Sequence, residues 1–233
     1  MSTIADLAEN RVVEGTYAVA RKERRRTKTG SDYLALELVD PSGKIEARVW
    51  NDVELLDSRF GEGDAVRVLG RVDKYRDRLQ LDVRSLEAAE GQDPSELTPA
   101  MRRDADELDG FLEFLGGELS HAGLKTLVSR FLADTRFRER LRELPASPGI
   151  HHDYAGGLLE HTVAVATLCR ETAQVHPRLR GDLLVAAAIL HDAGRTLELG
   201  RGPSFAPTEE GRLLGHVQLG IRLLESQAGG LER

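Results

Sequence analysis

The chain has little cysteine, no long apolar run and no targeting segment at its start, and each shortage excludes a class of protein. Of its 233 residues only Cys169 is a cysteine, so no intrachain disulfide can form, which favours a reducing compartment. No stretch approaches the roughly 18–20 consecutive apolar residues that a membrane-spanning helix needs. The N-terminus, MSTIADLAEN, lacks the basic start and apolar centre of a signal peptide. We therefore expect a cytoplasmic protein with no membrane partner.

Aromatic residues and net positive charge are also scarce. Only 5% of the residues are aromatic, so the core must consist mainly of Leu, Val and Ala, and the net charge is −7. A chain with this charge does not attract nucleic acid over its whole surface. Positive charge is nevertheless concentrated in the stretch RKERRRTKTG, whose six basic residues are Arg21, Lys22, Arg24, Arg25, Arg26 and Lys28.

The first part of the chain alternates apolar and polar side chains in five segments, which predicts five β-strands. The segments are VVEGTYAVA, YLALELVD, KIEARVW, AVRVLGRVDKY and RLQLDVRSLEA. Asp40 to Gly43 form a predicted turn between the second and third, and NDVELLDSRFGEGD predicts a short helix after the third. Three strands, a helix and two strands is the order of an OB-fold, a barrel that binds oligonucleotides. We assign residues 1–88 to such a nucleic-acid-binding domain.

The basic stretch falls in the predicted connection between the first two strands, which borders the binding face of an OB-fold. Tyr33 and Trp50 on the strands, and Tyr75 near the last hairpin, offer rings on which bases can stack. Basic and aromatic residues together are typical of sequence-tolerant binding to single strands. Alternation does not fix which way Trp50 points, so a place in the barrel core is an equal alternative. A solvated loop is the alternative for the basic stretch, and the predicted partner is single-stranded RNA, with DNA as the second choice.

A polar segment with Pro94 and Pro99 predicts a linker over residues 89–101. Residues 102–233 have the period of helices, so we predict a multi-domain α+β protein in which an all-α domain follows the barrel. The first helical segment places Leu108, Phe111, Leu112 and Leu115 on one predicted face, and we expect it to serve packing only.

Three later apolar segments each carry a histidine, and the pattern predicts a metal site. His161 and His216 lie on predicted helices, and His191-Asp192 closes the longest apolar run in the chain. One histidine on an apolar face is usually a satisfied core residue. Several of them together with a carboxylate, which is costly to bury unpaired, favour a divalent cation. Mixed His and Asp ligation suits manganese, iron, zinc or cobalt.

The spacing H-x29-H-D-x23-H resembles the HD superfamily of metal-dependent phosphohydrolases. The barrel segment TKTGSDYLALELVDPSGKIEARVW, followed by HHDYAGGLLEHT, HDAGR and EEGRLLGHVQLG, resembles the YhaM family more closely. These are bacterial 3′-to-5′ exoribonucleases that join an N-terminal OB-fold to an HD domain. The resemblance covers nearly the whole chain. It implies phosphodiester hydrolysis of single-stranded RNA from the 3′ end, a divalent metal (manganese first, with iron, zinc, cobalt and magnesium as alternatives) and self-association into a homo-oligomer.

The resemblance also implies roles for individual residues. His161, His191 and Asp192 match the ligands of the first metal, and Asp192 is also expected to sit between that metal and the attacking water. His216 matches a ligand of a second metal. The pair His151 and His152 matches histidines near the pocket mouth with a substrate role, His152 being a catalytic candidate. Arg195, also a catalytic candidate, stands where the family usually has lysine and is expected to meet a phosphate through its planar fork.

The family continues beyond the last of these positions with a histidine pair and a final aspartate. This sequence ends seventeen residues after His216, so the expectation is a truncated relative, an incomplete metal site or a site that a second subunit completes. Asp153 and Glu198 are substitutes that the spacing does not support. Two other functions therefore stay open: a non-catalytic single-strand-binding protein with an incomplete HD site, and an HD-type nucleotide phosphohydrolase.

Overall fold

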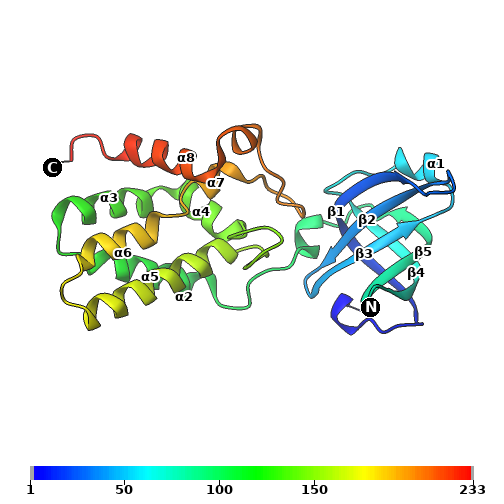
Figure 1. The fold of residues 1–233 in the computed structure, drawn as a ribbon, viewed down its shortest axis with the longest axis horizontal. Helices are drawn as coiled ribbons and strands as arrows, with labels where there is room; N and C mark the ends of the chain where they lie inside the picture. The colour runs from blue at the N-terminus through cyan, green and yellow to red at the C-terminus, as the bar shows by residue number, and fades with distance from the viewer. Residues whose placement is uncertain (1–2, 232–233) are drawn as a thin grey trace. The chain divides into compact units, whose positions relative to one another are not determined.

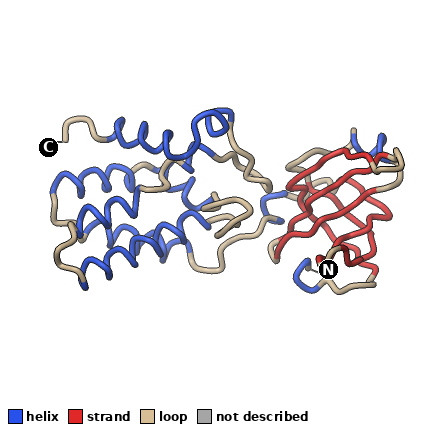
Figure 2. Tube along the Cα trace, in the orientation of Figure 1, coloured by secondary structure: helices blue, strands red, loops and turns tan. Residues whose placement is uncertain are grey.

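The computed structural model describes residues 3–231, which form two compact units, a barrel and a helical unit that begins at Ala100 (Figure 1). The predicted fold class, a five-stranded OB-fold barrel followed by an all-α domain, is confirmed (Figure 2). Within the described residues, no helix has the length and apolar character needed to cross a membrane.

The barrel closes in the order β1-β2-β3-β5-β4. Neighbouring strands are antiparallel except β3 and β5, which are parallel. A short helix, α1, lies between β3 and β4 as predicted, and a 3-10 turn, η1 (Ile4–Asp6), precedes the barrel. The elements are β1 (Val12–Arg26), β2 (Asp32–Asp40), β3 (Gly43–Val49), α1 (Val53–Asp57), β4 (Ala65–Tyr75) and β5 (Arg78–Ala88).

The strand β1 is longer than its alternation predicts, and this corrects the place of the basic stretch. From Lys22 to Arg26 the strand pairs in continuous register with residues 32–36 of β2, so these residues are held by ladder hydrogen bonds. The connection between the strands shrinks to residues 27–31 and keeps only Lys28 of the six basic residues. The expected basic loop is therefore a basic edge of a strand pair, in which side chains alternate between the two faces.

The predicted turn between β2 and β3 depends on the Asp40 carboxylate. Its oxygens accept hydrogen bonds from the backbone N–H of Ser42 (2.8 Å) and Gly43 (3.1 Å). They also accept one from the backbone N–H of Ile4 (2.7 Å), which attaches the N-terminal segment to the barrel. Although Asp40 is only 5% exposed, these bonds satisfy its charge, as a buried carboxylate requires.

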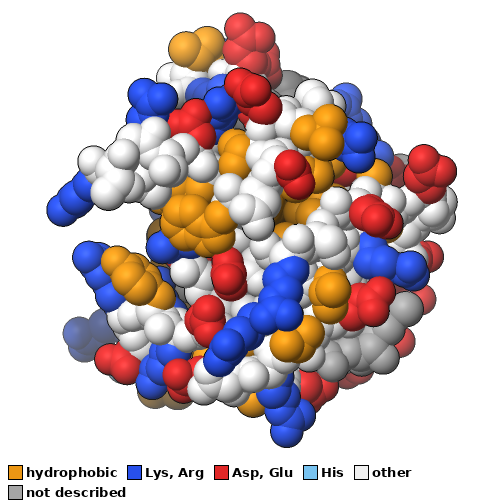
Figure 3. Space-filling model, turned by 90° about the vertical axis from the view of Figure 1, so that its right-hand side faces the viewer, with side chains coloured by type: hydrophobic (Ala, Val, Ile, Leu, Met, Phe, Trp, Pro, Cys, Tyr) orange, Lys and Arg blue, Asp and Glu red, His pale blue; other side chains and the backbone are white. Residues whose placement is uncertain are grey.

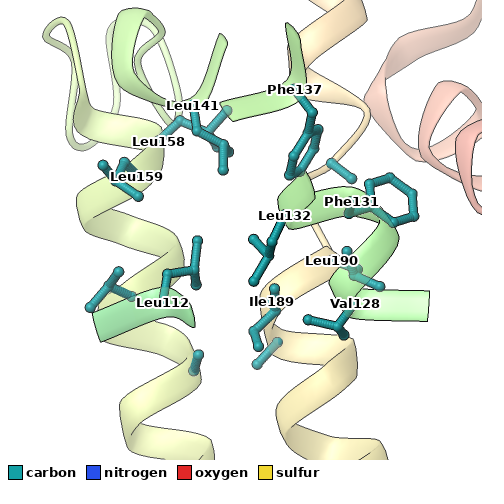
Figure 4. Packing of buried hydrophobic residues seen from close by; sticks show 14 of the residues in the cluster. Leu112, Val128, Phe131, Leu132, Phe137, Leu141, Leu158, Leu159, Ile189 and Leu190 are labelled. Carbon is teal, nitrogen blue, oxygen red and sulfur yellow. The ribbon is translucent and has the colours of Figure 1, made fainter. Parts of the chain in front are cut away.

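Buried side chains of the helical unit form one leucine-rich core (Figure 4). Leu108, Leu112 and Leu115 are fully buried as predicted, whereas Phe111 is 37% exposed, so its predicted core position is wrong. A further 3-10 turn, η2 (Pro94–Leu97), lies in the predicted linker. The helices are α2 (Ala105–Gly117), α3 (Ala122–Ala133), α4 (Thr135–Glu143), α5 (Gly157–Val175), α6 (Gly181–Leu190), α7 (Arg195–Glu198) and α8 (Glu209–Gln227).

The helix α8 begins as the sequence predicts but is not continuous. The Thr208 side chain caps its N-terminus by accepting a hydrogen bond from the Gly211 N–H (3.0 Å). At Gly215 the backbone leaves the helical region, with φ 69° and ψ 163°, and helical geometry resumes at His216. A glycine is suited to this break because a side chain is strained at positive φ. The break turns the second half of α8 so that it starts with His216.

Candidate metal centre and nucleic-acid surface

Three helices and a turn bring the predicted metal ligands together. His161 lies in α5, His191 is the residue that ends α6, and Asp192 follows in the turn to α7. His216 comes from the second half of α8. The close approach of α8 depends on Gly194, because a Cβ at this position would overlap the carbonyl oxygen of His216. Four predicted ligands that are up to 55 residues apart in sequence (His161 to His216) therefore meet at one place.

The Asp192 carboxylate lies at the centre of this group and offers one oxygen to each side. Its Oδ2 is 3.5 Å from His191 Nε2 and 3.9 Å from His161 Nε2. Its Oδ1 is 3.7 Å from His216 Nε2. The two Nε2 atoms of His161 and His191 are 3.2 Å apart. His161 and His191 therefore face one oxygen of Asp192, and His216 faces the other.

The spacing and the ring orientation fit a cation bound by His161, His191 and Asp192. Ligand atoms about 2.1 Å from one ion lie roughly 3.0–3.4 Å from each other, close to the 3.2 Å between the two Nε2 atoms. His191 Nδ1 is 2.8 Å from the carbonyl oxygen of Ala188, an acceptor, so Nδ1 carries the proton and Nε2 keeps its lone pair for a metal. The donor set therefore suits a divalent cation.

Burial favours the metal-binding form of His161. Desolvation lowers the pKa of this imidazole below its usual 6.5, and the nearby His191 lowers it further, while Asp192 acts in the opposite direction. A lowered pKa keeps the ring neutral, and the neutral ring is the form that binds a metal.

Glu198 is a site residue that sequence reasoning named only as an unsupported substitute. Its Oε1 accepts a hydrogen bond from the His216 backbone N–H (3.1 Å) and lies 3.3 Å from His216 Nδ1. Its Oε2 accepts a bond of 2.6 Å from the Arg195 guanidinium. A carboxylate on Nδ1 fixes the ring so that Nε2 faces Asp192. No spacing could reveal this contact, because it requires the break at Gly215 that frees the His216 N–H from the helix.

Arg195 reaches the site but is turned inward. Its guanidinium binds Glu198, and its Nε lies 3.8 Å from Asp192 Oδ1, with no hydrogen-bond partner among the described residues. The side chain is 17% exposed. The structure therefore brings Arg195 to the carboxylates of the centre, and its expected contact with a phosphate stays a prediction.

The pair His151 and His152 lies beside His161, on the loop before α5. The ring centroids of His151 and His161 are 5.0 Å apart, and those of His152 and His161 are 5.4 Å apart. His151 is exposed and His152 half-buried. Asp153 follows on the same loop but is absent from the described groups of converging metal-binding atoms, whereas both histidines belong to one.

The aromatic residues predicted for nucleic-acid binding lie on the outer surface of the barrel. Trp50 is 41% exposed, which excludes the alternative that it fills the core. Its ring stacks on Tyr33 with centroids 4.7 Å apart and an interplanar angle of 28°. Tyr75 is 49% exposed, and the guanidinium of Arg48 lies 4.9 Å from its ring and 5.8 Å from the ring of Tyr33. Arg48 thus links the three rings, and alternation along β3, which places it with Trp50, could have identified it.

The basic residues of β1 are already paired with acidic neighbours. Arg24 and Arg26 bind Asp32 at 2.7 and 3.0 Å, and Arg21 and Arg25 both bind Glu23. The hydrogen bond from Arg24 lowers the pKa of the Asp32 carboxyl below its usual value. On the face seen in Figure 3, basic and acidic side chains are likewise interspersed. These arginines therefore carry counter-charges, which differs from the freely charged loop that the sequence predicts.

Lys22 has a structural environment. Its Nζ donates hydrogen bonds of 2.6 Å to the carbonyl oxygens of Asp57 and Phe60 and forms an ion pair of 2.9 Å with the Asp57 carboxylate. It also lies 4.5 Å from the Phe60 ring centroid, and its side chain is 11% exposed. These contacts attach α1 and the segment after it to β1. We therefore omit Lys22 from the candidate surface, whereas Lys28 is exposed in the turn that follows β1.

Comparison with known proteins identifies both domains. A family model described as an OB-fold nucleic acid binding domain matches residues 18–89, and the model of the HD domain matches residues 158–232. Among solved structures, the second OB-fold domain of replication protein A from Methanococcus maripaludis aligns with 39% of this chain and 96% of that one, with 24% identity and a TM-score of 0.32.

Curated relatives align with most of this chain. The 3′-5′ exoribonuclease YhaM of Listeria innocua is 31% identical over 193 residues, which cover 82% of this chain and 61% of that protein. The protein of the same name from Oceanobacillus iheyensis is 28% identical over 222 residues, covering 94% of this chain and 69% of that protein. The chain therefore spans about three-fifths of the length of the first of these relatives.

Proposed function

Starting from the resemblance to YhaM-type exoribonucleases, which these comparisons confirm, we propose that this chain hydrolyses single-stranded RNA from its 3′ end with the help of divalent metal. The single observation that supports this most directly is the convergence of His161, His191 and His216 on the two oxygens of Asp192. The Asp192 side chain is only 12% exposed, and a divalent cation held by these rings would offset the cost of burying its charge.

In the proposed mechanism the side chains of this centre bind the metal and orient the reacting groups. A bound divalent metal would supply an acidified water and neutralise charge on the phosphate. His161, His191 and Asp192 would hold it, and His216, fixed by Glu198, would contribute on the other side of Asp192. We propose manganese, which the family resemblance favours.

His151 and His152 would lie on the substrate side of this centre, because the exposed His151 ring contacts His161 from the loop. Arg195 would limit the repulsion between the Asp192 and Glu198 carboxylates, since its guanidinium lies between them. Neither role requires a side chain to leave the position that the structure gives it.

The barrel would grip the strand by stacking more than by charge. Trp50 and Tyr75 present exposed rings and Tyr33 a half-buried one, and each stacked base contributes roughly 1–3 kcal/mol. Arg21, Arg24, Arg25, Arg26 and Lys28 would add phosphate contacts of lower weight, because the four arginines must exchange existing ion pairs.

The test is degradation of a single-stranded RNA labelled at its 5′ end, with Mn²⁺ and with chelator. Stepwise shortening from the 3′ end is expected, and His191→Ala should abolish it while RNA affinity stays unchanged. His176→Ala, which removes an exposed histidine at the C-terminal end of α5, is the matched control. Shortening that persists in His191→Ala would show that another site, or a contaminant, degrades the RNA. Binding without any shortening by the unaltered chain would support the non-catalytic alternative instead.

A further inference from the structure

The loop before α5 places two neighbouring histidines where a metal ion could use both. The Nδ1 atoms of His151 and His152 are 3.4 Å apart, and their rings are almost perpendicular, at 88°. One nitrogen from each of these rings and one from His161 lie within 4.8 Å of one another. Consecutive side chains of an extended segment point in opposite directions, so this shared orientation needs a cause.

The cause is a backbone conformation that the surrounding loop enforces. His152 has φ 45°, in the left-handed region, where a residue other than glycine is strained. The Ala146 N–H donates a hydrogen bond to the carbonyl oxygen of His152, and the Ser147 N–H donates one to the carbonyl oxygen of His151. Both bonds are 3.2 Å long. Gly157 completes the constraint, since a Cβ there would overlap the His152 carbonyl oxygen. The loop is thus pressed against the first turn of α5, one turn before His161.

From this geometry we infer that His151 and His152 bind a divalent cation together with His161, and so add imidazole ligands to the centre formed by His191 and Asp192. The 3.4 Å between the two Nδ1 atoms is the spacing of neighbouring ligands around one ion, roughly 3.0–3.4 Å. A set of three imidazoles favours borderline ions such as Co²⁺ or Zn²⁺ over Mg²⁺.

In the proposed reaction, the histidine pair would contact the substrate through the bound cation and not directly. A phosphate that reaches the exposed His151 would meet a cation held by the pair. This consequence rests on the proposed function, but binding of the metal does not, and the two are tested separately.

The experiment is a titration of the full chain with Co²⁺ in the absence of RNA. The chain is first freed of metal, and binding is monitored by calorimetry and by visible absorption. The variant combines His151→Ala with His152→Asn, since asparagine tolerates the left-handed conformation better than alanine. We expect at least a tenfold loss of Co²⁺ affinity, with a changed absorption band, because the ion keeps fewer imidazole ligands. His176→Ala should match the unaltered chain.

Identical affinity, stoichiometry and spectrum in the double variant and the unaltered chain would overturn the inference. The inference would also be overturned if the double variant differed from the unaltered chain only in how strongly inorganic phosphate inhibits RNA hydrolysis. The histidine pair would then contact phosphate directly. Should circular dichroism show that the double variant is unfolded, His151→Ala alone serves, because His151 is exposed and is not among the residues with positive φ. A chain that loses Co²⁺ through these substitutions, yet never shortens RNA, would refute the exonuclease proposal and leave this inference standing.

Discussion

Replacing Gly194 by alanine should damage the metal centre through a purely steric effect. The residue has φ −65° and ψ −18°, which alanine adopts freely, so the backbone conformation itself is no obstacle. A Cβ would, however, lie 2.5 Å from the Gly220 backbone nitrogen and overlap the His216 carbonyl oxygen. Ordinary contact begins near 3.4 Å, so the Gly220 contact alone requires α8 to move by about 0.9 Å relative to the turn that carries Asp192, and the closer His216 carbonyl oxygen requires more.

Such overpacking costs about 1–3 kcal/mol, which at roughly 2–4 °C per kcal/mol lowers Tm by about 2–12 °C. The displacement also separates His216 from Asp192, now 3.7 Å apart, and Mn²⁺ affinity should fall about 10–100-fold. Calorimetric scans and Mn²⁺ titrations measure the two effects. Gly110→Ala in α2 is the matched control, since its Cβ would meet nothing within 4 Å, and it should stabilise by about 0.5–1 kcal/mol. A Gly194→Ala variant with the Tm and the Mn²⁺ affinity of the unaltered chain would refute the reasoning.

Further predictions concern the barrel, pH and metal. Trp50→Ala should weaken single-stranded RNA binding by about 1–3 kcal/mol, or 5–150-fold, with an unchanged salt slope because no phosphate contact is lost; fluorescence anisotropy at several salt concentrations decides this. Lys22→Met should destabilise the barrel by about 1–3 kcal/mol without changing that slope, and a slope reduced by about one would return Lys22 to the binding face. The pKa of His161 is lowered in the folded chain, so the unfolded chain binds the proton more readily. The metal-free protein should therefore keep its full stability above about pH 6.5 and lose part of it as the pH falls below that value. Thermal unfolding with chelator from pH 8 to 5 tests this, and His161→Asn should show a shallower loss. Mn²⁺ at 100 times its Kd should stabilise the chain by about 2.7 kcal/mol, an effect that His191→Ala should remove.

The order of elements and the residues proposed as metal ligands follow from local sequence patterns, and the structure brings those residues together. Alternation in the barrel and the apolar run before His191 each reflect a face that must be buried. The pattern does not say which side of the barrel is inside, so it could not place Trp50 on the outer surface. It also could not predict that β1 extends through Arg26, because pairing with β2 overrides the loop-like composition of that stretch.

The arrangement around His216 could not be predicted from the sequence, because it depends on non-local contacts. In the sequence, Gly215 looks like an ordinary glycine within a helical segment. Only the structure shows that the helix breaks there and that Glu198 accepts a hydrogen bond from the freed His216 N–H. In the same way, the overlap that excludes a side chain at Gly194 arises from α8, more than twenty residues later in the chain.

The paired arginines of β1 have a consequence for movement along a strand. An enzyme that removes one nucleotide at a time must let its substrate advance after every cut, and each advance breaks and remakes the phosphate contacts. An arginine that returns to Asp32 or Glu23 when a phosphate leaves does not become an unpaired charge, so the free-energy barrier between successive registers is low. If the chain shortens RNA as proposed, this surface is suited to a sliding strand, held by its bases and only loosely by its backbone.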